Sequence, residues 1–132
     1  MGEESLCTKT TLLVVDDDEC MREALVLMLE KVGYNVKEAS RFEEAMEVMQ
    51  KEEDISLAIV DYTMPGKNGI DTLRELKNVK PSMGALLISG FSLNQNELKG
   101  LNNVLVLEKP FQLQELKDKI DNILSKTERK DL

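Results

Sequence analysis

The 132-residue chain contains no histidine and only two cysteines. Without histidine it can hold no His-based catalytic triad, no zinc site with a histidine ligand and no phosphorylated histidine of its own. Any chemistry that needs a histidine must come from a partner. Cys7 and Cys20 lack the CxxC spacing of zinc and redox motifs, so neither a disulfide nor a zinc role is expected.

Long apolar runs and a positive charge excess are also missing. No apolar stretch reaches membrane-spanning length, and the first residues show neither a secretory leader nor a myristoylation pattern. The net charge of −8 and the pI near 4.7 argue against direct binding to nucleic acid, which needs clustered lysines and arginines. We therefore expect a cytoplasmic protein that binds neither membranes nor nucleic acid directly.

The length and the 42% of hydrophobic residues suit one domain with one proper core. Four short apolar runs each lead into polar residues that could handle phosphate. The runs 12–15, 57–60, 85–88 and 104–107 are followed by Asp16-Asp17-Asp18, by Asp61, by Ser89 and, after Glu108, by Lys109-Pro110. Ligands of open parallel sheets bind beyond the carboxyl ends of the strands. The sequence therefore predicts acids, a hydroxyl group and a lysine at one edge of a sheet.

Between these runs the apolar residues recur at helical spacing, which predicts alternating strands and helices. The expected helices cover 19–32, a segment opened by a capping box of Ser40 and Glu43, a segment around 70–76, the polar stretch 94–101, and the segment after Pro110. An edge strand is expected at 35–39. Residues 1–10 are expected to be a flexible lead-in, 11–125 the domain and 126–132 a polar tail.

The predicted fold is therefore α/β: a flavodoxin-like, doubly wound, five-stranded parallel sheet with five helices. The strand order 2-1-3-4-5 is carried over from sheets of that type. In this order the first and third strands are neighbours, which brings Asp16 and Asp17 close to Asp61. Three carboxylates at short range repel one another, and a hard divalent cation, most plausibly Mg²⁺, relieves the repulsion. A single aspartate at such a junction is more often a helix N-cap, the role expected for Asp18.

These motifs resemble the receiver domain of two-component response regulators, from about Thr11 to Ser125. The matching residues are Asp16-Asp17, Asp61 with Met64-Pro65-Gly66 and Gly69 after it, Ser89, and Lys109-Pro110-Phe111. Each motif alone is weak, but together, in this order and at these intervals, they are specific.

The resemblance implies that Asp61 accepts a phosphoryl group from a phosphohistidine on a histidine kinase or histidine phosphotransfer protein. It implies that Asp17, Asp61 and the backbone carbonyl of Thr63 hold Mg²⁺, with Asp16 acting largely through bound water. Lys109 and the hydroxyl of Ser89 would contact phosphoryl oxygens, and the Lys109–Pro110 bond would be cis. The chain would be a signalling domain that promotes only its own phosphorylation and dephosphorylation. For Ser89, the role of a turn residue beside Gly90 stays open.

The chain departs from the family pattern at Val106, where the family usually has the tyrosine or phenylalanine that swings inward on activation. By the same resemblance, Thr63 and Phe91 occupy the two positions that control water entry. Neither offers a carboxylate or an amide to orient the water, which predicts a long-lived phosphoryl group. The Ser89-Gly90-Phe91-Ser92 segment resembles receivers attached to sensor kinases, so a stand-alone protein and a module of a hybrid kinase both stay open.

Two other families share parts of this pattern. A flavodoxin needs a loop after the first strand that is rich in Ser, Thr and Gly, and three aspartates there would repel its phosphate. A phosphatase of the haloacid-dehalogenase type needs a second aspartate two residues after its nucleophile, where Thr63 stands. Both readings are therefore less favoured.

Overall fold

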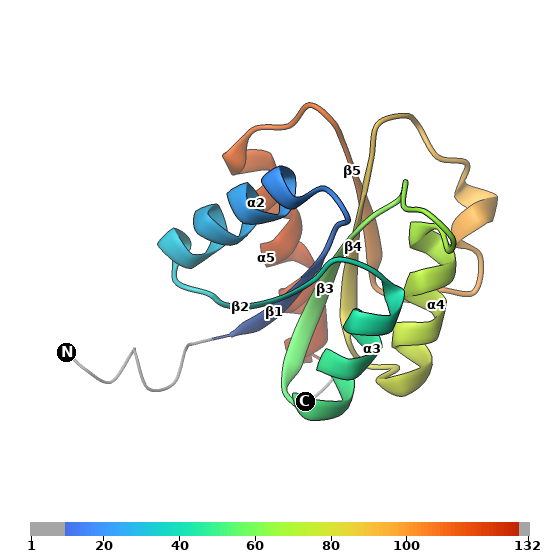
Figure 1. The fold of residues 1–132 in the computed structure, drawn as a ribbon, viewed down its shortest axis with the longest axis horizontal. Helices are drawn as coiled ribbons and strands as arrows, with labels where there is room; N and C mark the ends of the chain where they lie inside the picture. Colours follow the sequence, from blue (N-terminus) through green and yellow to red (C-terminus); the bar gives the residue numbers. More distant parts are fainter. Residues whose placement is uncertain (1–9, 130–132) are drawn as a thin grey trace.

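The computed structural model describes residues 10–129, and its five parallel strands form one sheet in the order β2-β1-β3-β4-β5 (Figure 1). The strands are β1 (Thr11–Val15), β2 (Asn35–Ala39), β3 (Ile55–Asp61), β4 (Gly84–Ser89) and β5 (Val104–Glu108). This order confirms the predicted flavodoxin-like architecture, including the edge position of β2. Residues 1–9, with Cys7 and most of the expected lead-in, and residues 130–132 lie outside the described part.

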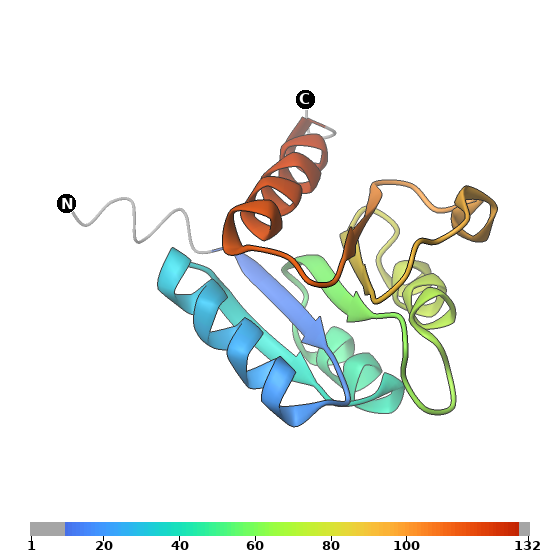
Figure 2. The same cartoon turned by 90° about the horizontal axis from the view of Figure 1, so that it is seen from above.

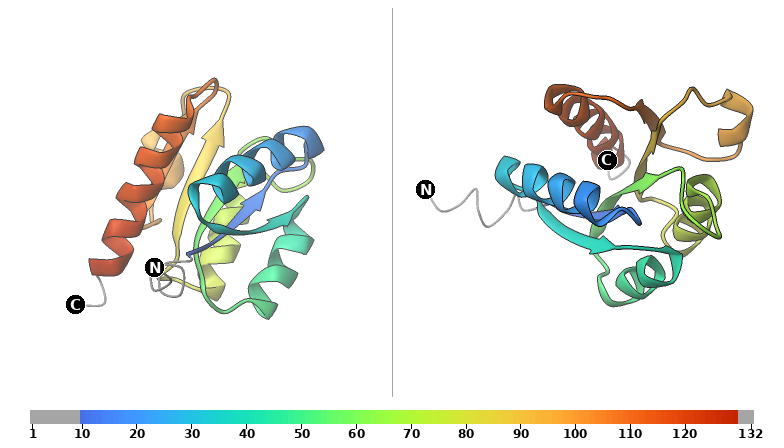
Figure 3. Two further views of the ribbon diagram at one scale, coloured as in Figure 1. Left: turned by 90° about the vertical axis from the view of Figure 1, so that its left-hand side faces the viewer. Right: turned by 45° about the horizontal axis from the view of Figure 1, so that its top comes forward.

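Helices cover both faces of the sheet (Figures 2 and 3). On one face lie α2 (Glu19–Val32) and α5 (Leu113–Arg129); on the other lie α3 (Phe42–Lys51) and α4 (Gly69–Val79). The layers are therefore helix, sheet and helix. None of the described helices is long and apolar enough to cross a membrane.

The strands alternate between two cores. In β1, Leu12 and Val14 belong to the core beneath α2 and α5, whereas Leu13 and Val15 belong to the core beneath α3 and α4. All four side chains are fully buried. Burying one such side chain stabilises the fold by roughly 1.5–3 kcal/mol. Because both faces of these strands are buried, their sequences are continuous apolar runs rather than an alternation of apolar and polar residues.

Helix α2, which follows the first acidic residues, has well-defined ends. The Asp18 side chain caps its beginning by accepting hydrogen bonds from the backbone N–H groups of Cys20 (3.0 Å) and Met21 (3.2 Å). Gly33 ends the helix with φ of +119°, a left-handed conformation that favours glycine. The capping role expected for Asp18 is confirmed, and it separates Asp18 from the other two aspartates of the run.

The expected helix over 94–101 is wrong in type and length. A single 3₁₀ helix, η1 (Gln95–Leu98), takes its place, so residues 10–129 contain four α-helices rather than five. The Asn94 side chain accepts a bond from the N–H of Asn96 (2.8 Å), which closes a tight turn. Within residues 94–101, only Leu98 and Leu101 pack against the core. This is too little apolar surface to stabilise a longer α-helix.

The capping box expected from Ser40 and Glu43 is also different. Helix α3 begins one residue later than expected, with Arg41 at its N-cap, so the third helical residue is Glu44. Glu44 accepts hydrogen bonds of 2.7 Å from both the N–H and the hydroxyl of Ser40. These two bonds hold the pKa of Glu44 below its usual range. Glu43 instead lies 3.7 Å from the Arg41 guanidinium.

Candidate functional site

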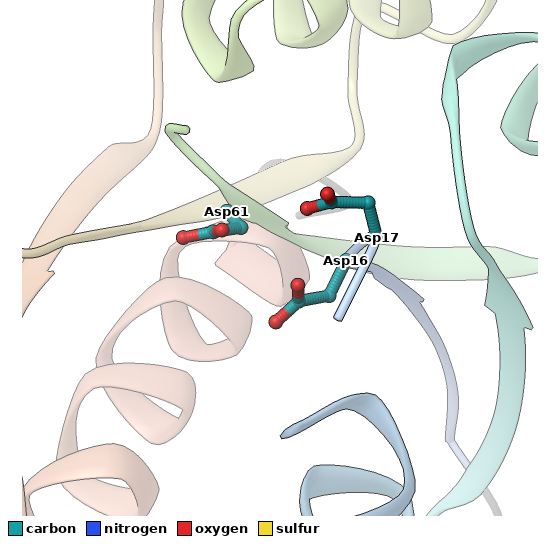
Figure 4. A group of neighbouring side chains, drawn as sticks. All are labelled: Asp16, Asp17 and Asp61. Carbon is teal, nitrogen blue, oxygen red and sulfur yellow. The ribbon is translucent and has the colours of Figure 1, made fainter. Parts of the chain in front are cut away.

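Three carboxylates meet at the carboxyl edge of the sheet (Figure 4). Asp16 and Asp17 follow β1, and Asp61 is the last residue of the neighbouring strand β3. One oxygen of each carboxylate lies within 4.8 Å of those of the other two. Asp16 and Asp61 are buried, whereas Asp17 is exposed. The predicted juxtaposition is therefore present, and its donors are the hard oxygen ligands that suit Mg²⁺.

Burial dominates the electrostatics of this acidic cluster. It raises the pKa of Asp16, against the opposing effect of a hydrogen bond from the backbone N–H of Asp18 (2.9 Å). Burial also raises the pKa of Asp61, against the opposing charge of Lys109. Because the charged forms of Asp16 and Asp61 are disfavoured, these two carboxyl groups favour either a proton or a nearby bound cation.

Lys109 reaches the cluster from the end of β5. Its Nζ lies 3.3 Å from Oδ1 of Asp61, and about one-third of the Lys109 side chain is exposed. The buried Oδ1 nevertheless has no hydrogen-bond partner among the described residues. The Lys109 backbone N–H donates to the carbonyl of Ser89 (2.8 Å), and the Lys109–Pro110 bond is cis, as the resemblance implied. The backbone bond to Ser89 thus helps to hold the lysine beside Asp61.

The loop after Asp61 is tight because two glycines permit it. The N–H of Gly69 donates to the carbonyl of Tyr62 (2.8 Å), and a Cβ at Gly69 would lie 2.6 Å from the Asp61 carbonyl oxygen. Gly66 has φ of +85°, in the left-handed region. Thr63 lies in this loop and is exposed. The glycines noted in the sequence therefore bring the start of α4 back to the end of β3, whereas the role of the Thr63 carbonyl stays a prediction.

Ser89 ends β4 and is buried, but its hydroxyl points into a local turn. It donates to the carbonyl of Phe91 (2.6 Å) and accepts from the N–H of Phe91 (3.1 Å). The turn role that the sequence left open is therefore present. A contact with a phosphoryl group on Asp61 requires the hydroxyl to leave the Phe91 carbonyl.

The aromatic side chains near this turn are arranged in a way that sequence reasoning missed. The Phe91 ring, 49% exposed, meets the Tyr62 ring edge to face, with 5.2 Å between centroids and 79° between planes. Val106 lies on β5 beside Leu87 and is partly buried against the core beneath α3 and α4. The only sequence signal for this arrangement was that Tyr62 directly follows Asp61. The contact between Tyr62 and Phe91 joins residues that lie far apart in the chain, so no local pattern predicts it.

Arg22 is a second residue that sequence reasoning missed. Its Nη1 donates to the backbone carbonyl of Asp16 (2.7 Å), and its Nε donates to Glu38 (2.9 Å) at the end of β2. The guanidinium therefore connects the ends of two neighbouring strands and fixes the backbone that carries the acidic pair. Its position on the polar side of α2 gave no hint of this contact.

The fold and the site together define a class: a doubly wound α/β domain with an acidic, cation-compatible cluster and a lysine at its switch point. Residues 12–121 match the model of the response regulator receiver domain. The chain belongs to the response regulator receiver family, a family of two-component signalling domains.

Individual relatives include both separate proteins and parts of larger ones. The chain is 35% identical over 116 residues to the response regulator receiver protein CpdR of Brucella abortus, covering 86% of this chain and 95% of that protein. It is 34% identical over 118 residues to the autoinducer 1 sensor kinase/phosphatase LuxN of Vibrio harveyi, covering 88% of this chain but 14% of the kinase. Response regulator TrrA of Thermotoga maritima, solved in complex with Mg²⁺-BeF, has a TM-score of 0.76 at 28% identity, over 86% of this chain and 98% of that one.

Proposed function

We propose that Asp61 accepts a phosphoryl group from a phosphohistidine of a partner protein and thereby switches the domain's conformation. The single observation that carries this proposal is the buried Asp61 carboxylate, which faces both Lys109 and the other two aspartates. In the transfer, an Asp61 oxygen bonds to phosphorus as the phosphorus–nitrogen bond breaks, and the electron pair returns to the partner's imidazole. The product is a mixed anhydride.

We propose Mg²⁺ as the cofactor. The raised pKa values of Asp16 and Asp61 and the close approach of three carboxylates are what a divalent cation would relieve. Asp17, Asp61 and the Thr63 carbonyl would hold the ion, with Asp16 acting through water. When bound, Mg²⁺ would supply positive charge beside the phosphoryl oxygens. The Mg²⁺-BeF complex of TrrA supports this assignment.

Lys109 and Ser89 would complete the phosphoryl site. The Lys109 ammonium is already beside Asp61 and would pair with a phosphoryl oxygen once the carboxylate is phosphorylated. The hydroxyl of Ser89 would donate to a second oxygen after leaving Phe91. Phosphoryl transfer depends mainly on such positioning and charge neutralisation, so no further nucleophile or base is needed. The domain would act on its own phosphoryl group and on no separate substrate.

The histidine must come from the partner because this chain has none. We propose that the partner is a histidine kinase or a histidine phosphotransfer protein, as the sensor kinases among the relatives suggest. We propose that such a partner binds at an apolar groove of about 370 Å³ beside Lys109. Its lining residues are Met21, Ala24, Leu25, Met28, Lys109, Pro110 and Phe111. We also propose that the reaction takes place in the cytoplasm, the setting that the sequence led us to expect.

Incubation with acetyl phosphate and Mg²⁺, followed by intact-mass measurement, tests this function. Wild type should gain the mass of one phosphoryl group, and Asp61→Asn should gain none. Asp18→Asn is the matched control, because it makes the same chemical change in the same acidic region at a residue that caps α2. Equal labelling of wild type and Asp61→Asn would refute the assignment.

A further inference from the structure

The hydroxyl of Ser89 is fully committed to the backbone of Phe91. It donates to the Phe91 carbonyl at 2.6 Å and accepts from the Phe91 N–H at 3.1 Å. A serine hydroxyl has one proton to donate. It therefore cannot donate to a phosphoryl oxygen on Asp61 and to Phe91 at once. Recruitment of Ser89 by the phosphoryl group must break the bond to the Phe91 carbonyl.

Phe91 in turn positions Tyr62. The two rings meet edge to face at 5.2 Å, an arrangement that aromatic quadrupoles favour. Tyr62 directly follows Asp61 in the chain, and its hydroxyl lies 3.4 Å from Oε1 of Glu97 in η1. A continuous set of contacts therefore runs from Ser89 through two aromatic rings to η1.

No ring is available at position 106 to make this connection. Val106 packs against the same core cluster as Tyr62, on the face covered by α3 and α4. Leu93 and Leu98, on either side of the start of η1, pack against that cluster too. Tyr62 is thus the aromatic residue on this face that contacts both the Ser89 turn and η1.

We propose that Tyr62 is the aromatic switch residue of this receiver. Phosphorylation of Asp61 draws the Ser89 hydroxyl away from Phe91, the Phe91 ring loses its fixed position, and Tyr62 leaves its contact with Glu97. The inference rests on the proposed phosphorylation of Asp61 and adds the path by which it reaches the surface.

The contacts around η1 determine which part of the chain moves when Tyr62 leaves Glu97. The backbone carbonyl of Glu97 accepts a bond from Arg74 Nη2 of α4 (3.1 Å). The Ser92 hydroxyl donates to Glu108 of β5 (2.7 Å), which anchors the far side of the Phe91 turn. Release of Tyr62 leaves both of these bonds in place. The movement is therefore confined to the segment between Ser92 and Glu97, whose two ends stay attached to β5 and to α4.

Fluorine NMR of protein labelled with 3-fluorotyrosine tests the proposal, because the chain has only two tyrosines. Tyr34 packs against the other core, with its hydroxyl 3.4 Å from Asp121, so its signal is an internal reference. Tyr34→Phe assigns the two signals. Beryllofluoride with Mg²⁺ serves as the phosphoryl analogue, and its bound fluorines show in the same spectrum whether the Asp61 site is filled.

In wild type, beryllofluoride should shift the Tyr62 signal and leave the Tyr34 signal in place. In Ser89→Ala, which lacks the bond to Phe91, the Tyr62 signal should already lie at the activated position and move no further. Ser125→Ala removes an exposed hydroxyl on α5, on the other face of the sheet, and should respond as wild type does.

Two outcomes would overturn the switch while leaving the phosphoacceptor intact. One is a bound beryllofluoride signal with an unmoved Tyr62 signal; the other is a Ser89→Ala response as large as that of wild type. Absence of bound beryllofluoride in wild type would overturn the proposed function itself, and this inference with it.

Discussion

The ammonium group of Lys109 lies 3.3 Å from Oδ1 of Asp61, yet this buried oxygen has no hydrogen-bond partner among residues 10–129. On its other side Asp61 faces the carboxylates of Asp16 and Asp17. A cation between the carboxylates would relieve their repulsion and leave Lys109 to pair with a phosphoryl oxygen. This arrangement of one lysine and three aspartates is the physical basis of the predictions below.

Millimolar Mg²⁺ should raise the melting temperature of wild type, because a ligand that binds only the folded state stabilises it. At 100 times its Kd the gain is about 2.7 kcal/mol. Asp17→Ala should show a much smaller shift, and Asp18→Asn should keep the full one. The measurement is thermal unfolding in Mg²⁺ and in EDTA. Equal shifts in wild type and Asp17→Ala would rule out the proposed metal site.

The raised pKa of Asp61 predicts a pH dependence in the absence of metal. A carboxyl whose pKa is raised by folding contributes stability below its unfolded pKa, and this contribution is lost as the pH rises through the folded value. Asp61→Asn, which is uncharged at every pH, should therefore melt about 2–5 °C higher than wild type at neutral pH.

That advantage should disappear as the pH falls toward the ordinary aspartate pKa of about 4. Melting curves in EDTA across this range test it, with Asp18→Asn as the control. An advantage of Asp61→Asn that grows toward acid pH would show that burial does not disfavour the charged form.

Phe91→Glu should shorten the life of the phosphoryl group severalfold. The wild-type ring is apolar and offers water no hydrogen bond, whereas a carboxylate there could orient an attacking water. The measurement is first-order loss of phosphate after the donor is removed. Phe91→Leu, which keeps the apolar character, is the control and should stay close to wild type. If Phe91→Glu loses phosphate no faster, Phe91 is a packing residue rather than a gate.

Hydrogen exchange with and without beryllofluoride should change mainly across residues 89–107. This segment runs from the Ser89 turn through η1 into β5, and its only helix is a single 3₁₀ turn, a low-stability element in which switching is easiest to accommodate. Helices α2 and α3 should keep their exchange rates. Changes confined to α2 and α3 would show that phosphorylation alters a different surface of the domain from the one predicted.

Much of the fold and site could be predicted because the signals are local. Apolar runs that end in Asp61, Ser89 or Lys109 identify the strands and their carboxyl ends. The strand order is not a local signal and was carried over from sheets of this type; it determines which strand ends are neighbours and brings Asp16 and Asp17 to Asp61. The beginning of α2 at the Asp18 cap and its end at Gly33 also depend only on adjacent residues.

The features that could not be predicted depend on long-range contacts or on one-residue shifts. Arg22 reaches Glu38 and the Asp16 carbonyl across two strands, and no periodicity encodes that contact. The partner of Ser40 is Glu44 rather than Glu43 because α3 begins one residue later. The segment 94–101 has helical spacing but too little apolar surface, and side-chain bonds such as that of Asn94 favour a 3₁₀ turn.

The identity of the phosphorylated residue is the central claim, and direct mapping tests it most sharply. Protein phosphorylated by acetyl phosphate in Mg²⁺ is reduced with borohydride, which converts a phosphoaspartate to homoserine, and its peptides are sequenced by mass spectrometry. We predict homoserine at position 61 in wild type, in Asp18→Asn and in Ser89→Ala, and none at Asp16 or Asp17. Homoserine at another aspartate in wild type, or undiminished phosphorylation of Asp61→Asn, would contradict the account.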